Sequence, residues 1–405
     1  MPHLSEHERF MRRALDLAAH GLGRVEPNPM VGCVLVRNRR VIGEGFHQRF
    51  GGPHAEVEAL RACRGSPRGA TAYVTLEPCC YHGKTPPCTD TLLAAGVGRV
   101  YAAMRDPNPR VSGAGIDQLR KAGVAVEVGL CAGPAAMLNA PFIKLMQQRR
   151  PWVILKWAQS LDGRIATRTG DSKWISDDAM RAHAHALRAR VDAIIVGVRT
   201  ALRDDPALTC RLADPLRIAT RIVLDPDLRL PATSQLVATA REFPTRVYHA
   251  MPAPGAAARP IASAARKLRA SGVVVRDLPR TGSDSRATRA ARGDARVRRP
   301  ADPGVSLPHL LDDLGADSMT NVMIEGGGRL LGRFLDERLA DEIQIYIAPL
   351  LIGGRRAVGA LDGAGARTVV EAVRLSTSHR ADGAPHATVK PVGSGWVFQG
   401  RLWEP

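Results

Sequence analysis

The residues best suited to chemistry are one histidine, one glutamate and two cysteines in the first part of the chain. They follow one another as His54, Glu56, Cys79 and Cys88, with a proline directly before Cys79. Imidazole and thiolate are common zinc ligands, and a catalytic zinc keeps one of its four tetrahedral positions for water. Because His54, Cys79 and Cys88 supply only three ligands, the pattern predicts a hydrolytic zinc centre with an open position.

Glu56 is the predicted catalytic residue of this centre. It lies two residues after His54, near the expected start of a helix, so it can face the metal-bound water without ligating the metal. A zinc ion lowers the pKa of its bound water toward neutrality. A neighbouring carboxylate can take a proton from this water and deliver it to the substrate, which is general acid–base catalysis. An H-x-E pattern followed by P-C-x-x-C is the signature of zinc deaminases.

The segment between the two cysteines departs from that signature. Eight residues, CYHGKTPP, separate Cys79 from Cys88, and their prolines and glycine predict a looped excursion. The alternative is a purely structural zinc, which would normally need a fourth protein ligand. Cys80 or His82 could supply that ligand, so the sequence leaves both interpretations open.

The composition is that of a globular protein of two or three domains. The chain has 405 residues, of which 45% are hydrophobic and 24% charged, and this is ample material for two cores. No apolar run is long enough to span a membrane, and the first residues lack the features of a signal peptide, so we expect a cytoplasmic location. Three of the seven cysteines, Cys79, Cys80 and Cys88, fall within ten residues. That clustering favours metal binding over disulfides.

The formal net charge of +18 is partly due to one unusual stretch. Residues 276–303 contain eight arginines against four aspartates and almost no large apolar residue. We expect a solvated, flexible insertion over about 278–304 that cannot bury a core. A contact with a polyanion is the alternative. The remaining positive charge is equally suited to phosphorylated small substrates.

The periodicity of the first 150 residues predicts alternating helices and strands, and therefore an α/β sandwich. Ser5 and Glu8 fit a capping box that begins a helix ended by Gly21. The other expected elements are a strand hairpin over 31–45, helices over 54–63, 87–96 and 114–122, strands over 70–76, 97–104 and 124–128, and a helical connector over 134–150.

A second α/β series begins at Pro151. Its expected strands are 152–158, 192–198, 221–225, 245–250, 273–277, 321–327 and 342–353, and its expected helices are 177–190 (capped by Ser176), 307–314 and 329–339. The sequence IEGGG at 324–328 places bare backbone N–H groups at a helix start, which is a natural anion site. A tight strand-to-helix turn is the alternative, because the dinucleotide fingerprint G-x-G-x-x-G is absent.

Four motifs in the first domain resemble the bacterial bifunctional riboflavin-biosynthesis deaminase–reductase family. They are HAEV (54–57), TLEPC (75–79), HGKTPPC (82–88) and RDPNP (105–109). The resemblance runs from about residue 5 to 148, and it includes the long loop between the cysteines. It implies a zinc-dependent pyrimidine deaminase domain with a cytidine-deaminase-like α/β/α sandwich over residues 1–148. Cys80-Tyr81 stands where the family usually has Ser-His.

By the same resemblance, five residues would line the pocket for the pyrimidine and the ribose phosphate. They are Asn28, His47, Lys84, Asp106 and Asn108. An amide and an acid can read the donor and acceptor edges of a ring, and a lysine can meet a phosphate. Asn28 and Asn108 lie between prolines, so they could instead be turn residues.

The second domain resembles the reductase half of the same family, which is similar in fold to dihydrofolate reductase and uses NADPH. The motifs are KWAQSLDGR (156–164), GDSKWIS (170–176), RDDPALT (203–209) and EGGG (325–328). The resemblance covers about residues 151–365 and implies a reductase domain over 151–405. It assigns NADPH to Ala158, Trp174, Thr200, Asp204, Gly327, Gly328, Arg329, Leu330, Leu331, Gly332 and Arg333. It assigns the reductase substrate to Ser172, Arg188, Leu208, Arg211 and Glu325, with Arg188 and Arg211 as phosphate clamps and Asp204 as our choice of proton donor.

The resemblance implies two successive reactions of riboflavin biosynthesis. Hydrolysis removes the 2-amino group of 2,5-diamino-6-ribosylamino-4(3H)-pyrimidinone 5′-phosphate, and NADPH then reduces the ribosyl group of the resulting aminouracil to ribityl. The predicted cofactors are thus Zn²⁺ and NADPH, and the predicted partner is a phosphorylated pyrimidine. We expect a homo-oligomer, no membrane contact and no nucleic acid. The alternatives are a tRNA-type nucleic-acid deaminase with an accessory domain, a zinc-stabilised binding protein, and a partly decayed enzyme in which only one half is active.

Overall fold

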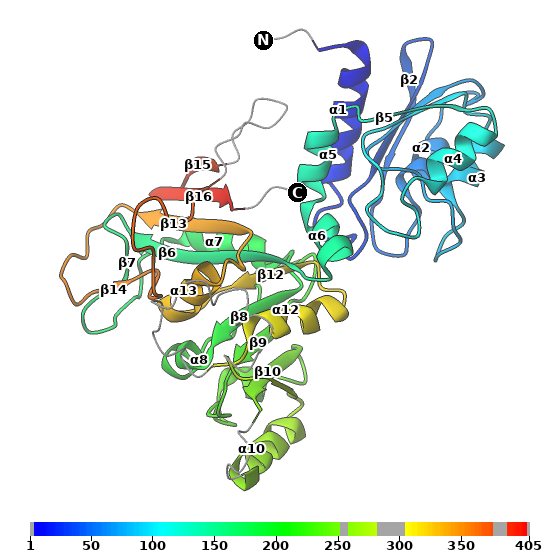
Figure 1. The fold of residues 1–405 in the computed structure, drawn as a ribbon. Coiled ribbons are helices and arrows are strands. Elements are labelled where there is room, and N and C mark those ends of the chain that lie inside the picture. Colours follow the sequence, from blue (N-terminus) through cyan, green and yellow to red (C-terminus); the bar gives the residue numbers. More distant parts are fainter. Residues whose placement is uncertain (1–3, 252–257, 282–303, 376–386, 403–405) are drawn as a thin grey trace. The chain divides into compact units, whose positions relative to one another are not determined.

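The computed structural model describes residues 4–251, 258–281, 304–375 and 387–402 (Figure 1). The chain divides into two compact units, the first ending at Arg149 and the second beginning at Arg150. In the described residues, no helix is long and apolar enough to cross a membrane.

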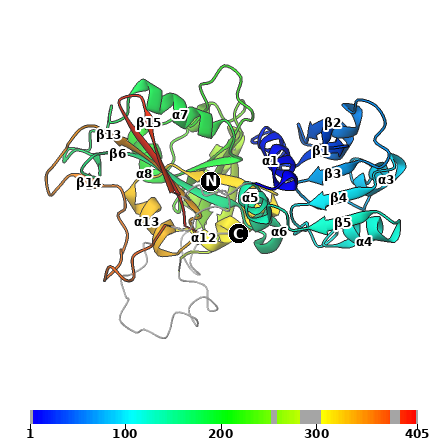
Figure 2. The same ribbon diagram turned by 90° about the horizontal axis from the view of Figure 1, so that it is seen from above.

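The first unit is built on a five-stranded sheet in the order β2-β1-β3-β4-β5 (Figure 2). The strands are β1 (Gly32–Arg37), β2 (Arg40–Phe46), β3 (Thr71–Val74), β4 (Arg99–Ala102) and β5 (Ala125–Val128). β1 and β2 form the predicted antiparallel hairpin, whose turn residues Asn38 and Arg39 have φ of 49° and 61°. Two consecutive left-handed residues match the twist of a hairpin. β3, β4 and β5 pair in parallel.

Helices cover both faces of this sheet. α1 (Glu6–Ala19) and α5 (Ala132–Leu138) contribute to one buried cluster, while α2 (Ala55–Arg61), α3 (Cys88–Ala94) and α4 (Ala114–Lys121) contribute to the other. Alternate residues of β1 face opposite clusters, with Val34 beneath α1 and Leu35 beneath α2. Ser5 begins α1 with the predicted capping box, since its Oγ accepts from the backbone N–H of Glu8 at 3.2 Å. The predicted sandwich of three layers is confirmed.

The connector over 134–150 is helical as predicted, and the structure divides it into two helices. α5 ends at Leu138 and α6 (Ala140–Gln148) follows after Asn139. Pro141 lies in the first turn of α6, where its missing N–H costs no helical hydrogen bond. The amide side chain of Asn139 bonds both backbone groups of Met30, at 2.8 and 3.0 Å. The side chain of Asn139, at the break between the two helices, therefore anchors the segment that carries Asn28.

The second unit is built on a nine-stranded sheet in the order β11-β10-β9-β8-β12-β6-β13-β16-β15. The pairs from β11 to β13 are parallel, and β16 and β15 extend the sheet antiparallel. Central parallel strands are buried on both faces, which explains the near-continuous apolar runs that predicted them. The bounds are β6 (Trp152–Ser160), β8 (Ala193–Gly197), β9 (Thr220–Leu224), β10 (Thr245–Ala250), β11 (Val274–Leu278), β12 (Asn321–Ile324), β13 (Glu342–Ala348), β15 (Ala387–Val392) and β16 (Gly395–Arg401). β7 (Arg164–Ala166) and β14 (Val358–Gly359) form a separate ribbon.

The helices of this unit are α7 (Asp178–Arg188), α8 (Val198–Asp204), α9 (Gln235–Ala238), α10 (Ala258–Ala270), α12 (Leu307–Ala316) and α13 (Gly328–Asp336). The predicted cap at Ser176 is wrong by one residue. Asp177 is the N-cap of α7, because its carboxylate accepts from the backbone N–H of Met180 at 2.8 Å. A carboxylate at a helix N-terminus also interacts favourably with the helix dipole.

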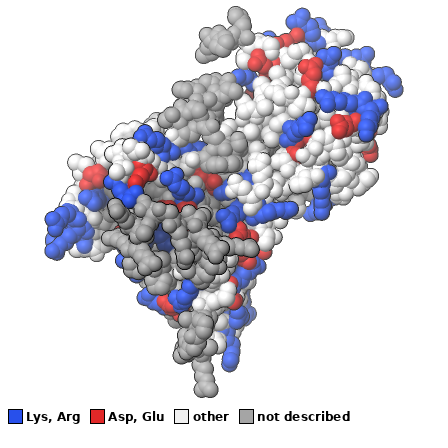
Figure 3. All heavy atoms as spheres, in the orientation of Figure 1, with Lys and Arg blue, Asp and Glu red and all other residues white. Residues whose placement is uncertain are grey.

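Most of the arginine-rich stretch, residues 282–303, lies outside the described residues. Its first residues do not belong to an insertion: Arg276 is part of β11, and its guanidinium pairs with Asp313 at 2.6 Å. On the face drawn in Figure 3, the basic groups of the described residues are interspersed with acidic and neutral ones.

Candidate functional site

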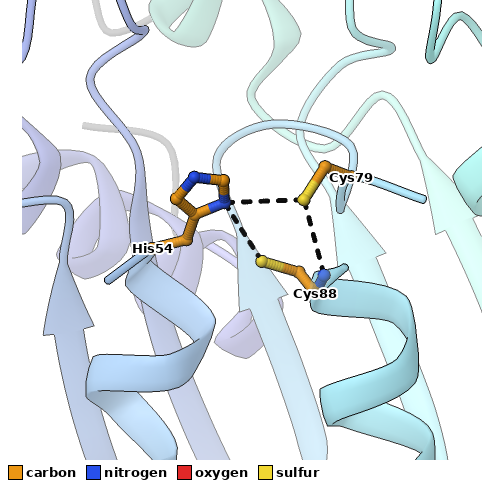
Figure 4. Close-up of side chains that lie close together, drawn as sticks. All are labelled: His54, Cys79 and Cys88. Atoms are coloured by element: carbon orange, nitrogen blue, oxygen red, sulfur yellow. Dashed lines mark hydrogen bonds between the residues drawn. The ribbon is translucent and has the colours of Figure 1, made fainter. Parts of the chain in front are cut away.

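The three predicted zinc ligands lie together in the first unit (Figure 4). His54 precedes α2, Cys79 follows β3, and Cys88 is the first residue of α3. The Nδ1 atom of His54 lies 3.5 Å from the Sγ of Cys79 and 3.3 Å from the Sγ of Cys88. Among the residues that the structure describes, neither Cys80 nor His82 joins this cluster. The arrangement therefore favours an open, catalytic centre over a closed structural one.

The protonation of this cluster also suits a metal. A hydrogen bond from Cys88 lowers the pKa of the Cys79 thiol to about 4, so Cys79 is a thiolate at neutral pH. A thiolate beside an imidazole nitrogen is a donor set that zinc prefers. The other ring nitrogen of His54, Nε2, lies 3.3 Å from the Oγ1 of Thr85, and a contact of that kind orients a metal-ligating imidazole. The residues present fit a zinc ion.

Glu56 lies in the first turn of α2 and is 3% exposed. Burial raises the pKa of its carboxyl group above the ordinary value. A buried carboxylate with a raised pKa can exchange a proton near neutral pH, which general acid–base catalysis requires.

A cavity of about 310 Å³ adjoins this cluster. Its lining includes His54, Glu56 and Cys79 together with all five residues expected to bind the pyrimidine substrate, namely Asn28, His47, Lys84, Asp106 and Asn108. The fold thus brings together Asn28 and Asn108, which are 80 residues apart in the sequence.

Hydrogen bonds fix the orientation of His47 in this cavity. Its Nδ1 lies 2.9 Å from the carbonyl oxygen of Pro53, which can only accept a hydrogen bond, so Nδ1 carries the proton. The unprotonated Nε2 then accepts from the amide of Asn28 at 3.2 Å. Burial lowers the pKa of His47, in agreement with a neutral ring.

Sequence reasoning missed several residues of this cavity. Phe50 lies beneath the ammonium group of Lys84, whose Nζ is 3.9 Å from the ring centre. Tyr81, Thr85 and Glu77 also line the cavity. The signal for Glu77 and Thr85 was present, since both belong to motifs that contain a zinc ligand. Burial raises the pKa of Asp106 to about 7.

A second cavity, of about 550 Å³, lies at the carboxyl ends of β8, β9 and β12. Six of the residues predicted to hold NADPH line it: Thr200, Gly327, Gly328, Arg329, Leu330 and Arg333. The Oγ1 of Thr200 accepts from the backbone N–H of Gly327 at 3.1 Å, which joins the segments after β8 and β12. Ligands of open α/β sheets bind at this end of the strands.

The other five predicted cofactor residues are not in the lining of that cavity: Ala158, Trp174, Asp204, Leu331 and Gly332. The side chain of Leu331 is fully buried in the core. Trp174 is 70% exposed and stacks on the guanidinium of Arg181 at 4.4 Å. Asp204 ends α8, with its carboxylate 2.9 Å from the Nε of Arg203.

Three predicted reductase-substrate residues, Arg188, Arg211 and Glu325, belong to one polar cluster. The guanidinium of Arg188 donates to both carboxylate oxygens of Glu325, at 2.8 and 2.6 Å, and to the carbonyl of Thr209 at 3.1 Å. Three of its five N–H donors are thus used inside the protein, and its role as a phosphate clamp stays a prediction. The exposed Arg211 is the better candidate, and its backbone N–H lies 3.3 Å from His185 Nδ1. Leu208 is buried with a φ of 52°, and Ser172 is half-buried.

Lys156 is a member of this cluster that sequence reasoning did not single out. Its Nζ lies 3.9 Å from Glu325 and 5.4 Å from the ring centre of Tyr346. Burial lowers the pKa of this lysine. The signal was a single basic residue inside the apolar strand WVILKWA, because a lysine is rarely buried without a partner or a function.

Comparison with known proteins identifies the family. Residues 151–384 match the RibD C-terminal domain, and residues 4–104 match the cytidine and deoxycytidylate deaminase zinc-binding region. The riboflavin biosynthesis protein RibD of Actinobacillus pleuropneumoniae is 39% identical, over 90% of this chain and 90% of its own length. The chain belongs to the RibD family.

Further RibD proteins agree with this assignment. That of Escherichia coli is 40% identical, over 86% of this chain and 89% of its own length. A crystal form of Acinetobacter baumannii RibD has a TM-score of 0.78 at 34% identity, with 98% of both chains covered. A deaminase and reductase from Thermotoga maritima has a TM-score of 0.71, also at 34% identity and 98% coverage of both chains. The predicted family and fold class are confirmed, and the chain is an enzyme of riboflavin biosynthesis with a deaminase and a reductase domain.

Proposed function

We propose that residues 1–148 deaminate 2,5-diamino-6-ribosylamino-4(3H)-pyrimidinone 5′-phosphate, and that residues 151–405 reduce the ribosyl group of the product. The observation that carries the proposal is the convergence of His54, Cys79 and Cys88 beside Glu56, in a cavity that also contains a lysine, two asparagines and an aspartate. A cytoplasmic location and a homo-oligomeric state stay predictions.

In the deaminase, His54, Cys79 and Cys88 would hold a zinc ion, which when bound makes a water molecule acidic enough to attack at neutral pH. Glu56 would take a proton from the attacking water and deliver it to the leaving amino group. Burial keeps Glu56 away from solvent, which prevents exchange of this proton with bulk water. The product is the aminouracil and ammonia.

The remaining residues of the cavity orient the substrate. Asn28 is held by His47, so its amide presents a fixed pattern to the pyrimidine ring. Lys84 supplies a positive charge for the 5′-phosphate, and the ring of Phe50 holds its ammonium group in place. Asp106 accepts from the backbone N–H of Asn108 at 2.8 Å, which fixes both residues in one turn.

In the reductase, the 550 Å³ cavity would hold NADPH, which when bound supplies the hydride. Of the candidate proton donors, Lys156 suits the role better than Asp204. Lys156 is 15% exposed in the polar cluster with Glu325. Asp204 is exposed, and its carboxylate is paired with Arg203. We therefore assign protonation of the sugar oxygen to Lys156.

The test supplies the diaminopyrimidine substrate to the full chain, with and without NADPH, and follows ammonia release and NADPH oxidation. Ammonia should appear without NADPH, and oxidation of NADPH should follow deamination. A zinc chelator should stop ammonia release while reduction of a pre-deaminated substrate continues. Simultaneous loss of both reactions on chelation would contradict two independent sites.

A further inference from the structure

Glu77 is a buried carboxylate to which nothing above assigns a role. It follows β3 and lies two residues before Cys79, and its side chain is 3% exposed. A carboxylate taken out of water is costly unless hydrogen bonds replace its hydration. The partners of Glu77 therefore indicate what it does.

Within the described part of the chain, the carboxylate of Glu77 accepts hydrogen bonds from backbone N–H groups of one segment, residues 106–116. Gly113 donates to both carboxylate oxygens at 2.9 Å, Gly115 donates at 3.0 Å and Ile116 at 3.3 Å. These groups belong to the start of α4, where the first N–H groups have no partner within the helix. The N-cap residue Gly113 has no side chain to satisfy them. Glu77 thus caps α4 from a distant loop.

The carboxylate of Glu77 also forms a hydrogen bond with the loop that lines the substrate cavity. The backbone N–H of Asp106 donates to Glu77 at 3.2 Å, and Asp106 in turn holds the backbone N–H of Asn108 at 2.8 Å. Asp106 and Asn108 both line the cavity. A single side chain therefore ties the loop of a zinc ligand to the loop that carries two proposed substrate residues.

Close packing at Gly115 shows independently that these two loops are held together. A Cβ atom on Gly115 would lie 2.1 Å from the carbonyl oxygen of Pro78, the residue directly before Cys79. Atoms cannot approach to that distance, so any side chain at position 115 would push α4 away from the zinc-ligand loop.

We propose that Glu77 is a positioning residue of the deaminase, which sets the place of Asp106 and Asn108 relative to the zinc ligands through its hydrogen bonds to the backbone of residues 106–116. The proposal rests on the assignment of Asp106 and Asn108 to the substrate pocket. Glutamine is the informative replacement, because it has one acceptor oxygen and its amide group would face N–H donors that it cannot satisfy. The loop then loses its fixed position while the volume of the side chain is kept.

The experiment measures deaminase kinetics, zinc content and reduction of a pre-deaminated substrate for full-length Glu77→Gln. We expect the KM for the diaminopyrimidine to rise by roughly 10-fold, with a much smaller change in kcat, unchanged zinc content and an unchanged reductase rate. Gly115→Ala, which separates the same loops while Glu77 stays intact, should raise KM in the same way.

Asp90→Asn is the matched control. The carboxylate of Asp90 also contacts α4, through Gln118 at 2.8 Å, but it is exposed and does not touch residues 106–113. The Asp90→Asn substitution should leave the KM for the diaminopyrimidine unchanged. An unchanged KM in both Glu77→Gln and Gly115→Ala overturns the proposal. The proposal is also overturned if both variants lose kcat, zinc and the folded state together, because that result would show a purely structural role. If Asp106→Asn also leaves KM unchanged, the assignment of the substrate residues fails instead.

Discussion

The Nζ atom of Lys156 lies 3.9 Å from the carboxylate of Glu325, in a part of the second unit where both side chains are almost fully covered. Burial lowers the pKa of Lys156, the charge of Glu325 raises it, and the charge of Arg188 lowers it. Lys156 comes from the middle of β6, and Glu325 follows β12, the strand beside it. The pairing of these two strands therefore places a proton donor and the group that keeps it charged side by side.

This relationship predicts the pH profile of the reductase. Lys156 must be protonated to act as a donor, so the rate should fall as the pH rises through its pKa, below the ordinary 10.5. Glu325→Gln removes the charge that raises this pKa, so the high-pH limb of kcat/KM should move to lower pH. Asp204→Asn is the comparison variant. If Asp204→Asn abolishes reduction and Glu325→Gln leaves the limb in place, Asp204 is the donor and our assignment is wrong.

The Arg188–Glu325 pair also predicts how the second unit responds to acid. Burial by itself raises the pKa of Glu325, but the charges of Arg188 and Lys156 lower it to about 2, from 4.5. A lowered carboxyl pKa gives stability that is present above the unfolded-state value and is lost as the pH falls from about 4.5 toward 2. All five tryptophans lie beyond residue 150, so their fluorescence in urea titrations reports this unit. The double variant Arg188→Met/Glu325→Gln should lose less stability over this pH range, and an equal loss would contradict the prediction.

Glu56→Gln should abolish deamination and leave the metal in place. The amide cannot take a proton from water, so kcat should fall by roughly 10²- to 10⁴-fold. Zinc content should stay unchanged, because His54, Cys79 and Cys88 supply the ligands. Glu58→Gln is the control, since Glu58 lies on the same helix but forms a surface ion pair with Arg61 at 3.0 Å. Activity that survives in Glu56→Gln would require another proton carrier.

Arg221→Met should destabilise the second unit. Arg221 is fully buried, and its guanidinium donates to three carbonyl oxygens, of Ala207, Leu236 and Phe243, and to the hydroxyls of Thr239 and Thr245. Methionine leaves these acceptors buried without donors, which should lower the free energy of unfolding by about 2–4 kcal/mol. Tryptophan fluorescence in urea measures the loss. The exposed Arg266→Met should change it by less than about 0.5 kcal/mol, and a similar loss in both variants would show that the buried bonds are not the cause.

Arg199 and Arg229 should determine the preference for NADPH over NADH. Both line the 550 Å³ cavity, and neither forms an ion pair with any residue of the described ranges. NADPH differs from NADH by one phosphate, and a guanidinium binds phosphate with paired, charge-assisted hydrogen bonds. Arg199→Ala or Arg229→Ala should raise the KM for NADPH by roughly 10-fold and change the KM for NADH much less. Equal effects on both cofactors would instead place the two arginines on a phosphate that the cofactors share.

The sequence by itself predicted the metal-binding cluster. His54, Cys79 and Cys88 are residue types that ligate zinc, they occur in the order of a deaminase motif, and the structure brings their side chains together. Periodicity also predicted the central strands of both sheets, because strands buried on both faces require uninterrupted apolar runs. The break between α5 and α6 at Asn139 was not predicted, because its cause is a contact with Met30, 109 residues away in the chain.

Only the tertiary structure decided the roles that depend on burial and on partners. Arg221 looks like an ordinary basic residue until β9 is seen inside a nine-stranded sheet. Glu77 looks like part of a ligand motif until α4 is placed against it. Arg188 looks like an unpaired cation until Glu325 is placed beside it. In each case the charge state and the free donors of a side chain depend on neighbours that the fold supplies from distant segments, and the local sequence does not contain that information.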